Sequence, residues 1–416
     1  MSFYVILMIV VKFEMERRQK MSHQILAENL HSIWWIIFAA MLSPVLALMT
    51  RKYIPDAIWL LLFGVLIGPH VLKLAQMTES IEFLREIGMG FLFLLAGLEI
   101  STEDMKAHQG KKAMVTWLIS FILAVGVGYL ISKGNIAFAI VLAVATTSTA
   151  LGTLLPILKD SNMINKPIGK SILIHGAYGE LLPIIMMSLL LSTVSPWRSA
   201  LILITFTLLA FLIVVAPIRF IRKVPLLGKA ILSASHTTMQ TTLRITIFVL
   251  VSLMLLTAIL ELDIALGAFV AGIFMNVILK TFSPKYLYEI EKKVEVVGFS
   301  FLIPIFFITS GMNIDVFRVL NQWHLLILAF LFIFITRGMV VFIREKMSVT
   351  QSNLSSNKEK MTLALYSASG LPVIVAVTEM AKNNHIIDVT TASVLVASGA
   401  LTILIFPLCA KIISKS

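Results

Sequence analysis

The sequence contains little charge for its length and only one cysteine. Asp, Glu, Lys and Arg make up 13% of the 416 residues, while 58% are hydrophobic. Soluble globular proteins carry about 25% charged residues, and one soluble core could not bury this much apolar surface. The surplus must therefore face lipid. Cys409 has no second cysteine to pair with, which excludes an internal disulfide framework and a thiolate metal site.

The sequence also lacks the motifs of several functional classes. It has no Walker-type phosphate-binding loop, so ATP is not expected to supply energy. Its His, Ser and Glu residues show no nucleophile motif or metal-ligand spacing, so we expect neither an enzyme nor a resident cofactor. The net charge is +12, but the basic residues are scattered between apolar runs. This pattern is typical of topology signals rather than of a nucleic-acid site.

Long apolar runs recur along the whole chain. Runs of about 18 or more residues can cross the hydrocarbon core as helices, and lipid cannot satisfy the open backbone of other structures. We therefore predict an all-α polytopic membrane protein with 13 transmembrane helices. The predicted segments are 33–50, 55–75, 84–100, 112–132, 135–158, 166–192, 198–222, 239–262, 263–281, 295–312, 323–344, 360–382 and 387–412.

The distribution of Lys and Arg predicts the orientation. Most of the 34 basic residues lie in the connections after odd-numbered segments and in the C-terminal tail. By the positive-inside rule these are cytoplasmic, so the N-terminus lies outside and the C-terminus inside the plasma membrane. A basic cluster at 12–20 breaks the rule. The N-terminal extension, 1–32, is left as a surface amphipathic segment or as a sequence whose native start is Met21, and 33–416 forms one membrane transporter domain.

Two pairs of segments suggest an internal repeat. FLFLLAGLEI in 84–100 aligns with PIFFITSGMNI in 295–312 when Gly97 is placed on Gly311. Two segments further on in each half, 135–158 and 360–382 each carry small polar residues followed by Gly and Pro. These residues are Thr146, Thr147, Ser148, Thr149, Gly152 and Pro156 in one segment, and Ser367, Ser369, Gly370 and Pro372 in the other.

Such residues weaken helices, and interrupted helices at matching positions of two halves indicate a transporter binding site. We therefore predict that 33–192 repeats as 239–412 with inverted topology, and that helix 198–222 links the halves.

Three ionisable residues lie deep inside predicted segments. A charge at the bilayer centre costs at least about 2.5–3.5 kcal/mol, so it is retained for function or is paired. Glu180 lies in HGAYGELLP, where glycines thin the helix around it, and its carboxylate could hold either a proton or a metal cation. Arg337 could neutralise Glu180 or the carbonyls of a helix break. His175 could bond neighbouring helices, which is the more common role, or carry a proton.

The chain resembles the monovalent cation:proton antiporters of the second superfamily branch, the Kef-type and NapA-type carriers. The strings that carry the resemblance are LLLFGVLIGP, FLFLLAGLEI, ATTSTALGTLLPILKD, ALGAFVAGIF and PIFFITSGM. The resemblance implies a homodimer in which each chain has a dimerisation bundle and an ion-carrying bundle. It also implies two crossed, broken helices, at Thr147–Thr149 and Ser369–Gly370. The acidic motif of the family falls on Gly179 and Glu180, and its basic residue falls on Arg337.

Two departures from the family pattern affect the expected chemistry. The residue before the acid is Gly179 rather than Asp, Asn or Gln, and the acid is Glu rather than Asp. With one carboxylate in place of two, we expect electroneutral exchange of one monovalent cation for one proton. The nucleotide-binding domain of Kef-type channels has no counterpart, so no nucleotide control is expected.

The leading hypothesis is a Na+/H+ or K+/H+ antiporter working by alternating access. A small-anion carrier and a non-transporting sensor or assembly subunit of the same fold are the alternatives. The predicted ligands for the transported cation and the proton are Glu180, Thr147, Ser148, Thr149 and Ser369. Arg337 is the predicted compensating charge, and the predicted surrounding residues are His175, Tyr178, Gly179 and Gly370.

Overall fold

The computed structural model describes residues 2–50, 54–151, 154, 158, 163–164, 166–190, 198, 201–212, 240–282, 284–347 and 350–415. These residues form helices and connections, without a strand among them. The all-α class is therefore confirmed. Eight described helices are long and apolar enough to cross a membrane, and four apolar helices are shorter. The count of 13 stays a prediction, since 213–239 and parts of 152–200 lie outside the described residues.

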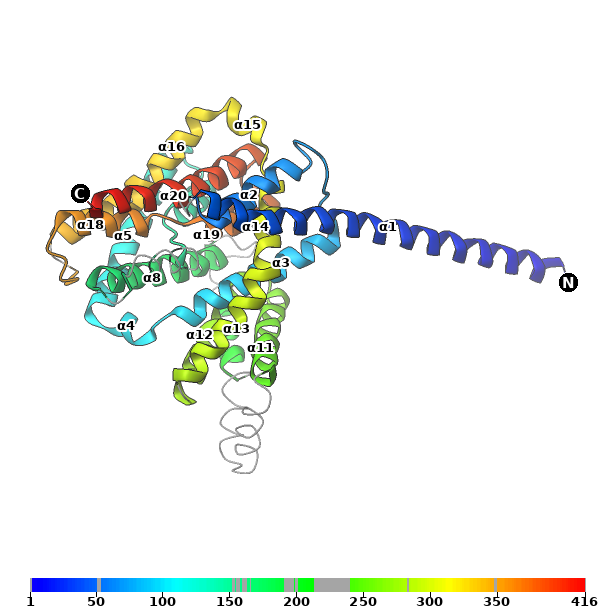
Figure 1. Ribbon diagram of the computed structural model, residues 1–416, viewed down its shortest axis with the longest axis horizontal. Coiled ribbons are helices and arrows are strands. Elements are labelled where there is room, and N and C mark those ends of the chain that lie inside the picture. Colours follow the sequence, from blue (N-terminus) through cyan, green and yellow to red (C-terminus); the bar gives the residue numbers. More distant parts are fainter. Residues whose placement is uncertain are drawn as a thin grey trace, which may run out of the picture.

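The helices pack into two bundles (Figure 1). The first contains α1 (Ser2–Met49), α2 (Asp56–Ile67), α3 (Glu79–Glu99), α11 (Gln240–Ile259), α12 (Ile264–Phe282), α13 (Pro284–Val297), the π-helical turn η1 (Gly298–Leu302) and α14 (Ile303–Met312). The second contains α5 (His108–Ile131), α6 (Ile136–Thr146), α8 (Pro167–Leu190), α16 (Trp323–Ile333), the π-helical turn η2 (Phe334–Met339), α17 (Val340–Lys346), α18 (Asn357–Ser367), α19 (Leu371–Asn383) and α20 (Val389–Lys415). Short helices α4 (Thr102–Lys106) and α15 (Val316–Asn321) lie between them in the chain.

Glycines set the helix contacts of the first bundle. A Cβ on Gly97 of α3 would lie 2.3 Å from the Phe269 carbonyl oxygen of α12. A Cβ on Gly311 of α14 would lie 2.2 Å from the Leu61 carbonyl oxygen of α2. The two glycines that align in the sequence thus each allow a second helix to pack closely against their own. Gly97 brings α12 against α3, and Gly311 brings α2 against α14. A repeat would give this arrangement, although the inverted repeat itself stays a prediction.

Two helices break where the sequence predicts. Helix α6 ends at Thr146, and residues 147–150 are not helical. Helix α18 ends at Ser367, and α19 starts at Leu371 with Pro372 in its first turn. Proline is tolerated there because the first N–H groups of a helix have no intrahelical partner. Gly152 and Pro156, which the sequence assigns to the first break, lie outside the described residues.

Some predicted boundaries are wrong. Segment 55–75 ends as a helix at Ile67, because Gly68 is extended ahead of Pro69, and proline disfavours the helical conformation in the residue before it. Helix α1 begins far before residue 33 and projects from the rest of the molecule in Figure 1. Of segment 198–222, the structure describes helix 201–212 and the single residue 198.

Candidate ion-binding site at the helix crossing

Three consecutive backbone N–H groups at the α6 break bond to three different partners. The Thr149 N–H donates to the Gly179 carbonyl at 2.8 Å, and the Ala150 N–H donates to the Ser369 carbonyl at 2.7 Å. The Leu151 N–H bonds to the Glu180 carboxylate. The break in one helix therefore satisfies its polar groups on α8 and on the second break. These bonds bring Thr149, Ser369 and Glu180 together at one crossing.

Hydroxyl groups complete the contact between the two broken helices. The Ser148 hydroxyl is shared between two carbonyls, Gly370 at 3.0 Å and Ala145 of its own helix at 2.8 Å, and Thr149 Oγ1 donates to the Ser367 carbonyl. A Cβ on Gly370 would lie 2.5 Å from the Ser148 carbonyl oxygen, so this position requires glycine because the two backbones approach closely. The structure thus places Ser148, Thr149 and Gly370 at the crossing.

Two predicted ligands direct their hydroxyl groups back to their own helix. Thr147 Oγ1 donates to the Ala143 carbonyl at 2.7 Å, and Ser369 Oγ donates to the Leu365 carbonyl at 3.2 Å. Their carbonyl groups face other elements instead. The Thr147 carbonyl accepts from Trp117 Nε1 of α5 at 3.1 Å. Sequence reasoning missed Trp117, since a tryptophan in an apolar run carries no signal of this role.

Glu180 is buried at the crossing without full hydrogen bonding. Its side chain is 1% exposed, and Oε2 has no hydrogen-bond partner among the described residues. A buried polar atom without a partner is costly, and natural proteins rarely keep one without a reason. The free oxygen can take a proton or coordinate a cation. Either would remove the cost of the unpaired atom.

Arg337 donates to oxygens of α8 and of the two helix breaks rather than to Glu180. The side chain is fully buried on η2, and its Nη2 donates to the His175 carbonyl at 2.9 Å and to Thr149 Oγ1 at 3.4 Å. Its Nε donates to the Ser367 carbonyl at 3.3 Å. The ion pairs found between described residues do not join Arg337 to Glu180. The sequence left open whether Arg337 contacts Glu180 or the carbonyls of a helix break. In the structure it contacts the Ser367 carbonyl at the second break.

Gly179 leaves no room for the polar residue that the family usually has. A Cβ at this position would lie 2.2 Å from Thr149 Oγ1 and 2.9 Å from Arg337 Nη2. The hydroxyl of Thr149 and the guanidinium of Arg337 already occupy that space. Glycine at position 179, where the family usually has a polar residue, is therefore the residue that fits the space at the crossing.

His175 pairs with an acid that the sequence analysis missed. Its Nε2 lies 3.5 Å from Glu345 Oε1, and the two side chains are 0% and 1% exposed. Ser352 Oγ donates to the other oxygen of Glu345. Sequence reasoning placed residue 345 in a loop after segment 323–344. Its neighbours Arg344 and Lys346 are basic, as is typical of a solvated helix end, but residues 350–352 fold back against the acid.

A cavity of about 570 Å³ opens on the Lys- and Arg-rich side, which we call the basic-side cavity. Its lining includes Leu151, Ala177 and Ser352, so it reaches α8 within one turn of Glu180. Asp104 lines it as well and binds Lys170 at 2.7 Å. Partial burial opposes the charge of Asp104, yet hydrogen bonds from Lys170 and Ser101 hold its pKa below the usual value. Tyr178 donates to the Met105 carbonyl at 2.9 Å beside this cavity.

One other group of acids among the described residues could hold a metal ion. Carboxyl oxygens of Glu99, Glu291 and Glu295 lie within 4.8 Å of one another. These acids are only partly buried and lie apart from the crossing, at the C-terminal end of α3 and on α13.

Comparisons with known proteins agree with this architecture. The chain is 25% identical over 401 residues to the Putative Na(+)/H(+) antiporter YjbQ of Bacillus subtilis, covering 91% of this chain and 62% of that protein. It is 25% identical to the Na(+)/H(+) antiporter of Enterococcus hirae, covering 88% and 94%. The solved structure of the sodium proton antiporter MjNhaP1 from Methanocaldococcus jannaschii at pH 8 matches with a TM-score of 0.60 at 20% identity. That match covers 92% of this chain and 96% of MjNhaP1, and it shows a shared fold.

A family model described as "Sodium/hydrogen exchanger, transmembrane" matches residues 37–415. This match covers both bundles and the helix crossing, in agreement with the resemblance found in the sequence. The chain belongs to the transmembrane sodium/hydrogen exchanger family.

Proposed function

We propose that the protein is a monovalent cation/proton antiporter in which H+ and Na+ or K+ compete for Glu180. The observation that carries the proposal is the buried, unpartnered Oε2 of Glu180 at the crossing of two broken helices. A proton or a cation satisfies that oxygen, and both cannot do so well at once. Family membership and the two relatives named as Na(+)/H(+) antiporters support cation exchange over the small-anion and non-transporting alternatives.

Charge balance supports electroneutral exchange. Among the described residues of the second bundle, the ionisable Asp, Glu, His, Lys and Arg side chains exposed by 1% or less are Glu180, Arg337, Glu345 and His175. Arg337 and Glu345 carry opposite charges, and both contact His175. Because these two charges balance, the buried interior of the bundle is neutral when Glu180 holds either a proton or a monovalent cation. If the bundle changes the side that the site faces only in these neutral states, it exchanges one cation for one proton.

The basic-side cavity supports a route from one side of the membrane to the site. It reaches α8 within one turn of Glu180, and the charged residues in its wall are two acids and two lysines, Glu99, Asp104, Lys166 and Lys170. By the distribution of Lys and Arg, this side faces the cytoplasm and the N-terminus lies outside a cell membrane. We infer a homodimer formed through the first bundle. The exposed apolar residues Phe248, Val251, Leu255 and Ile259 of α11 support a lipid or protein neighbour there.

Flux measurements in vesicles that contain only this protein test the proposal. Addition of Na+ or K+ should move protons across the membrane, and Glu180→Gln should abolish that movement, because glutamine cannot release a proton or carry a negative charge. Glu359→Gln is the matched control, since Glu359 closes the capping box of α18 and glutamine also fills that role. Normal exchange by the Glu180→Gln variant would contradict the mechanism.

A further inference from the structure

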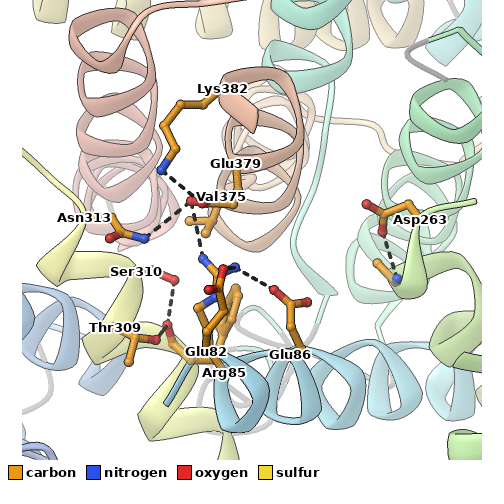
Figure 2. A network of polar contacts seen from close by, with 12 residues as sticks. Glu82, Arg85, Glu86, Asp263, Thr309, Ser310, Asn313, Val375, Glu379 and Lys382 are labelled. Atoms are coloured by element: carbon orange, nitrogen blue, oxygen red, sulfur yellow. Dashed lines mark hydrogen bonds and ion pairs between the residues drawn. The ribbon is translucent and has the colours of Figure 1, made fainter. Parts of the chain in front are cut away.

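The two bundles also meet through an arginine on the side opposite the basic-side cavity. Arg85 of α3 is 5% exposed, and its Nη1 lies 3.4 Å from Glu379 Oε2 of α19 in the second bundle. Its Nη2 lies 2.6 Å from Glu86 and 3.5 Å from Glu82, both on α3. Figure 2 shows Arg85 between these acids. We call Arg85, Glu82, Glu86 and Glu379 the Arg85 cluster; within it, the Arg85–Glu379 pair is the contact that joins the bundles.

The same acid receives a second contact from the first bundle. Asn313, the residue after α14, donates from Nδ2 to Glu379 Oε2 at 3.5 Å. Helix α19 is 13 residues long and begins next to Gly370 at the crossing. Glu379 follows Leu371 by about two turns of α19, so about 12 Å of one helix joins the Arg85 cluster to the candidate ion site. A change in the position of Glu379 would carry through α19 to that site.

A cavity of about 340 Å³ surrounds the cluster, and its wall is strongly acidic; we call it the opposite-side cavity. The acids in its lining are Glu82, Glu86, Glu261, Asp263 and Glu379, and its apolar lining includes Met89, Phe306 and Val375. Asp263 lies in the loop before α12. Burial and the negative charge of Glu86 raise its pKa to about 6, although a hydrogen bond from the Ala265 N–H acts in the opposite direction. Without Arg85, these like charges would repel across the bundle contact.

Both partners of the pair that joins the bundles keep a counter-charge on their own helix. Arg85 retains Glu86 and Glu82 on α3, and Glu379 retains Lys382 on α19 at 3.0 Å. If the Arg85–Glu379 pair separates, neither charge is left alone. Breaking a buried pair is costly chiefly when it leaves one charge uncompensated. This pair can therefore open and close at low cost, which a permanent structural contact does not need.

We propose that the Arg85–Glu379 pair closes the route from the opposite-side cavity to the crossing, and that it breaks whenever Glu180 faces that side. Arg85 is thus a positioning residue that sets which side of the membrane the site faces. This inference rests on the proposed function, because only a protein that alternates between two sides needs such a contact.

Cysteine labelling in liposomes tests the inference without measuring transport. Full-length protein carrying Cys409→Ala and either Val375→Cys, in the opposite-side cavity, or Ala177→Cys, in the basic-side cavity, is treated with a membrane-impermeant thiol reagent. Adding Glu379→Gln should raise the labelling rate at position 375 at least about fivefold and lower it at 177, because the population shifts towards the opened state.

Glu82→Gln is the matched control, since it removes another Arg85 carboxylate that lies on α3 and does not join the bundles. It should change both labelling rates by less than about twofold. Equal labelling with and without Glu379→Gln would overturn the inference, as would an equal effect of Glu82→Gln. Absence of ion flux in the vesicle assay would instead contradict the proposed function, and the labelling rates would still report on Arg85.

Discussion

At the scale of single residues, the crossing is organised around the space beside Gly179. Thr149 Oγ1 and Arg337 Nη2 fill the volume that a side chain at 179 would need. Thr149 bonds to Ser367 through its hydroxyl and to Gly179 through its N–H, so it cannot move aside without breaking the crossing. The identity of residue 179 is therefore coupled to that of residue 149.

This coupling predicts a non-additive pair of substitutions. Gly179→Asn should reduce exchange at least about tenfold and destabilise the protein by about 1–3 kcal/mol, as overpacking does. Adding Thr149→Gly, which empties the occupied space, should recover part of both losses. Flux and thermal unfolding in detergent measure the cycle. Gly126→Leu is the control for added bulk, since no atom lies within 4 Å of a Cβ there and the exposed position faces lipid. Equal losses in the single and double variants would exclude steric coupling.

At the scale of elements, the π-helical turn η2 carries Arg337 to the crossing. The turn interrupts the regular ladder between α16 and α17, and its inward residues Thr336, Arg337 and Gly338 are buried. π-Helical turns are frequent at functional sites because they change which side chains face inward. The guanidinium then reaches hydrogen-bond acceptors on three separate segments: the His175 carbonyl, Thr149 Oγ1 and the Ser367 carbonyl.

The three-way contact predicts that arginine cannot be replaced by lysine. Arg337→Lys keeps the charge but presents one ammonium in place of a planar fork, so it cannot reach all three acceptors. Exchange should fall at least about tenfold, with a lowered unfolding temperature. Arg344→Lys is the matched control, because among the described residues Arg344 donates one hydrogen bond, from Nε to Thr116 Oγ1. If both lysine variants retained similar activity, charge alone would explain the role of Arg337.

The loop before α12 predicts a pH dependence of stability. Asp263 accepts a hydrogen bond from the Ala265 N–H, and burial followed by the charge of Glu86 raises its pKa from 3.8 to about 6. A raised carboxyl pKa adds stability below about pH 4, and that stability is lost as the pH rises through about 6. Asp263→Asn keeps the acceptor and removes the charge. Its unfolding temperature should match wild type near pH 4 and exceed it above pH 6; equal values at both would contradict this.

At the scale of the whole molecule, charged contacts hold the second bundle at both sides of the membrane. Lys170 of α8 pairs with Asp104 of the connecting helix α4 near the basic-side cavity, and Arg85 of the first bundle pairs with Glu379 of the second at the opposite-side cavity. Figure 1 shows α3 running beside the bundle that contains α8, with α11 and α12 on its other side. The site at the crossing lies in the second bundle, so moving that bundle against the first would change its access.

The charge balance of the second bundle predicts the response to voltage. One-for-one exchange moves no net charge, so the rate should be unchanged when a diffusion potential of about 100 mV is imposed by a gradient of a permeant anion, with K+ equal on both sides. Proton flux driven by Na+ in vesicles with clamped potential measures this. A rate that rises or falls systematically with the imposed potential would contradict electroneutral exchange.

Much of the element-level organisation could be predicted because it depends on local chemistry. Apolar runs long enough to span lipid form helices, and small polar residues before glycine and proline mark the two breaks. Boundaries such as the end of α2 depended on a single Gly-Pro pair. The burial of Glu345 could not be predicted, since it results from residues 350–352 folding back over α17.

The sequence alone thus determined the all-helical membrane architecture, the two breaks and the buried acid, because each follows from properties of neighbouring residues. Only the tertiary structure decided which groups meet at the crossing. It placed Arg337 against carbonyl groups instead of Glu180, filled the space beside Gly179 with Thr149, and joined Arg85 to Glu379. These pairs lie far apart in the chain, and their contacts depend on how two bundles pack, which no local pattern records.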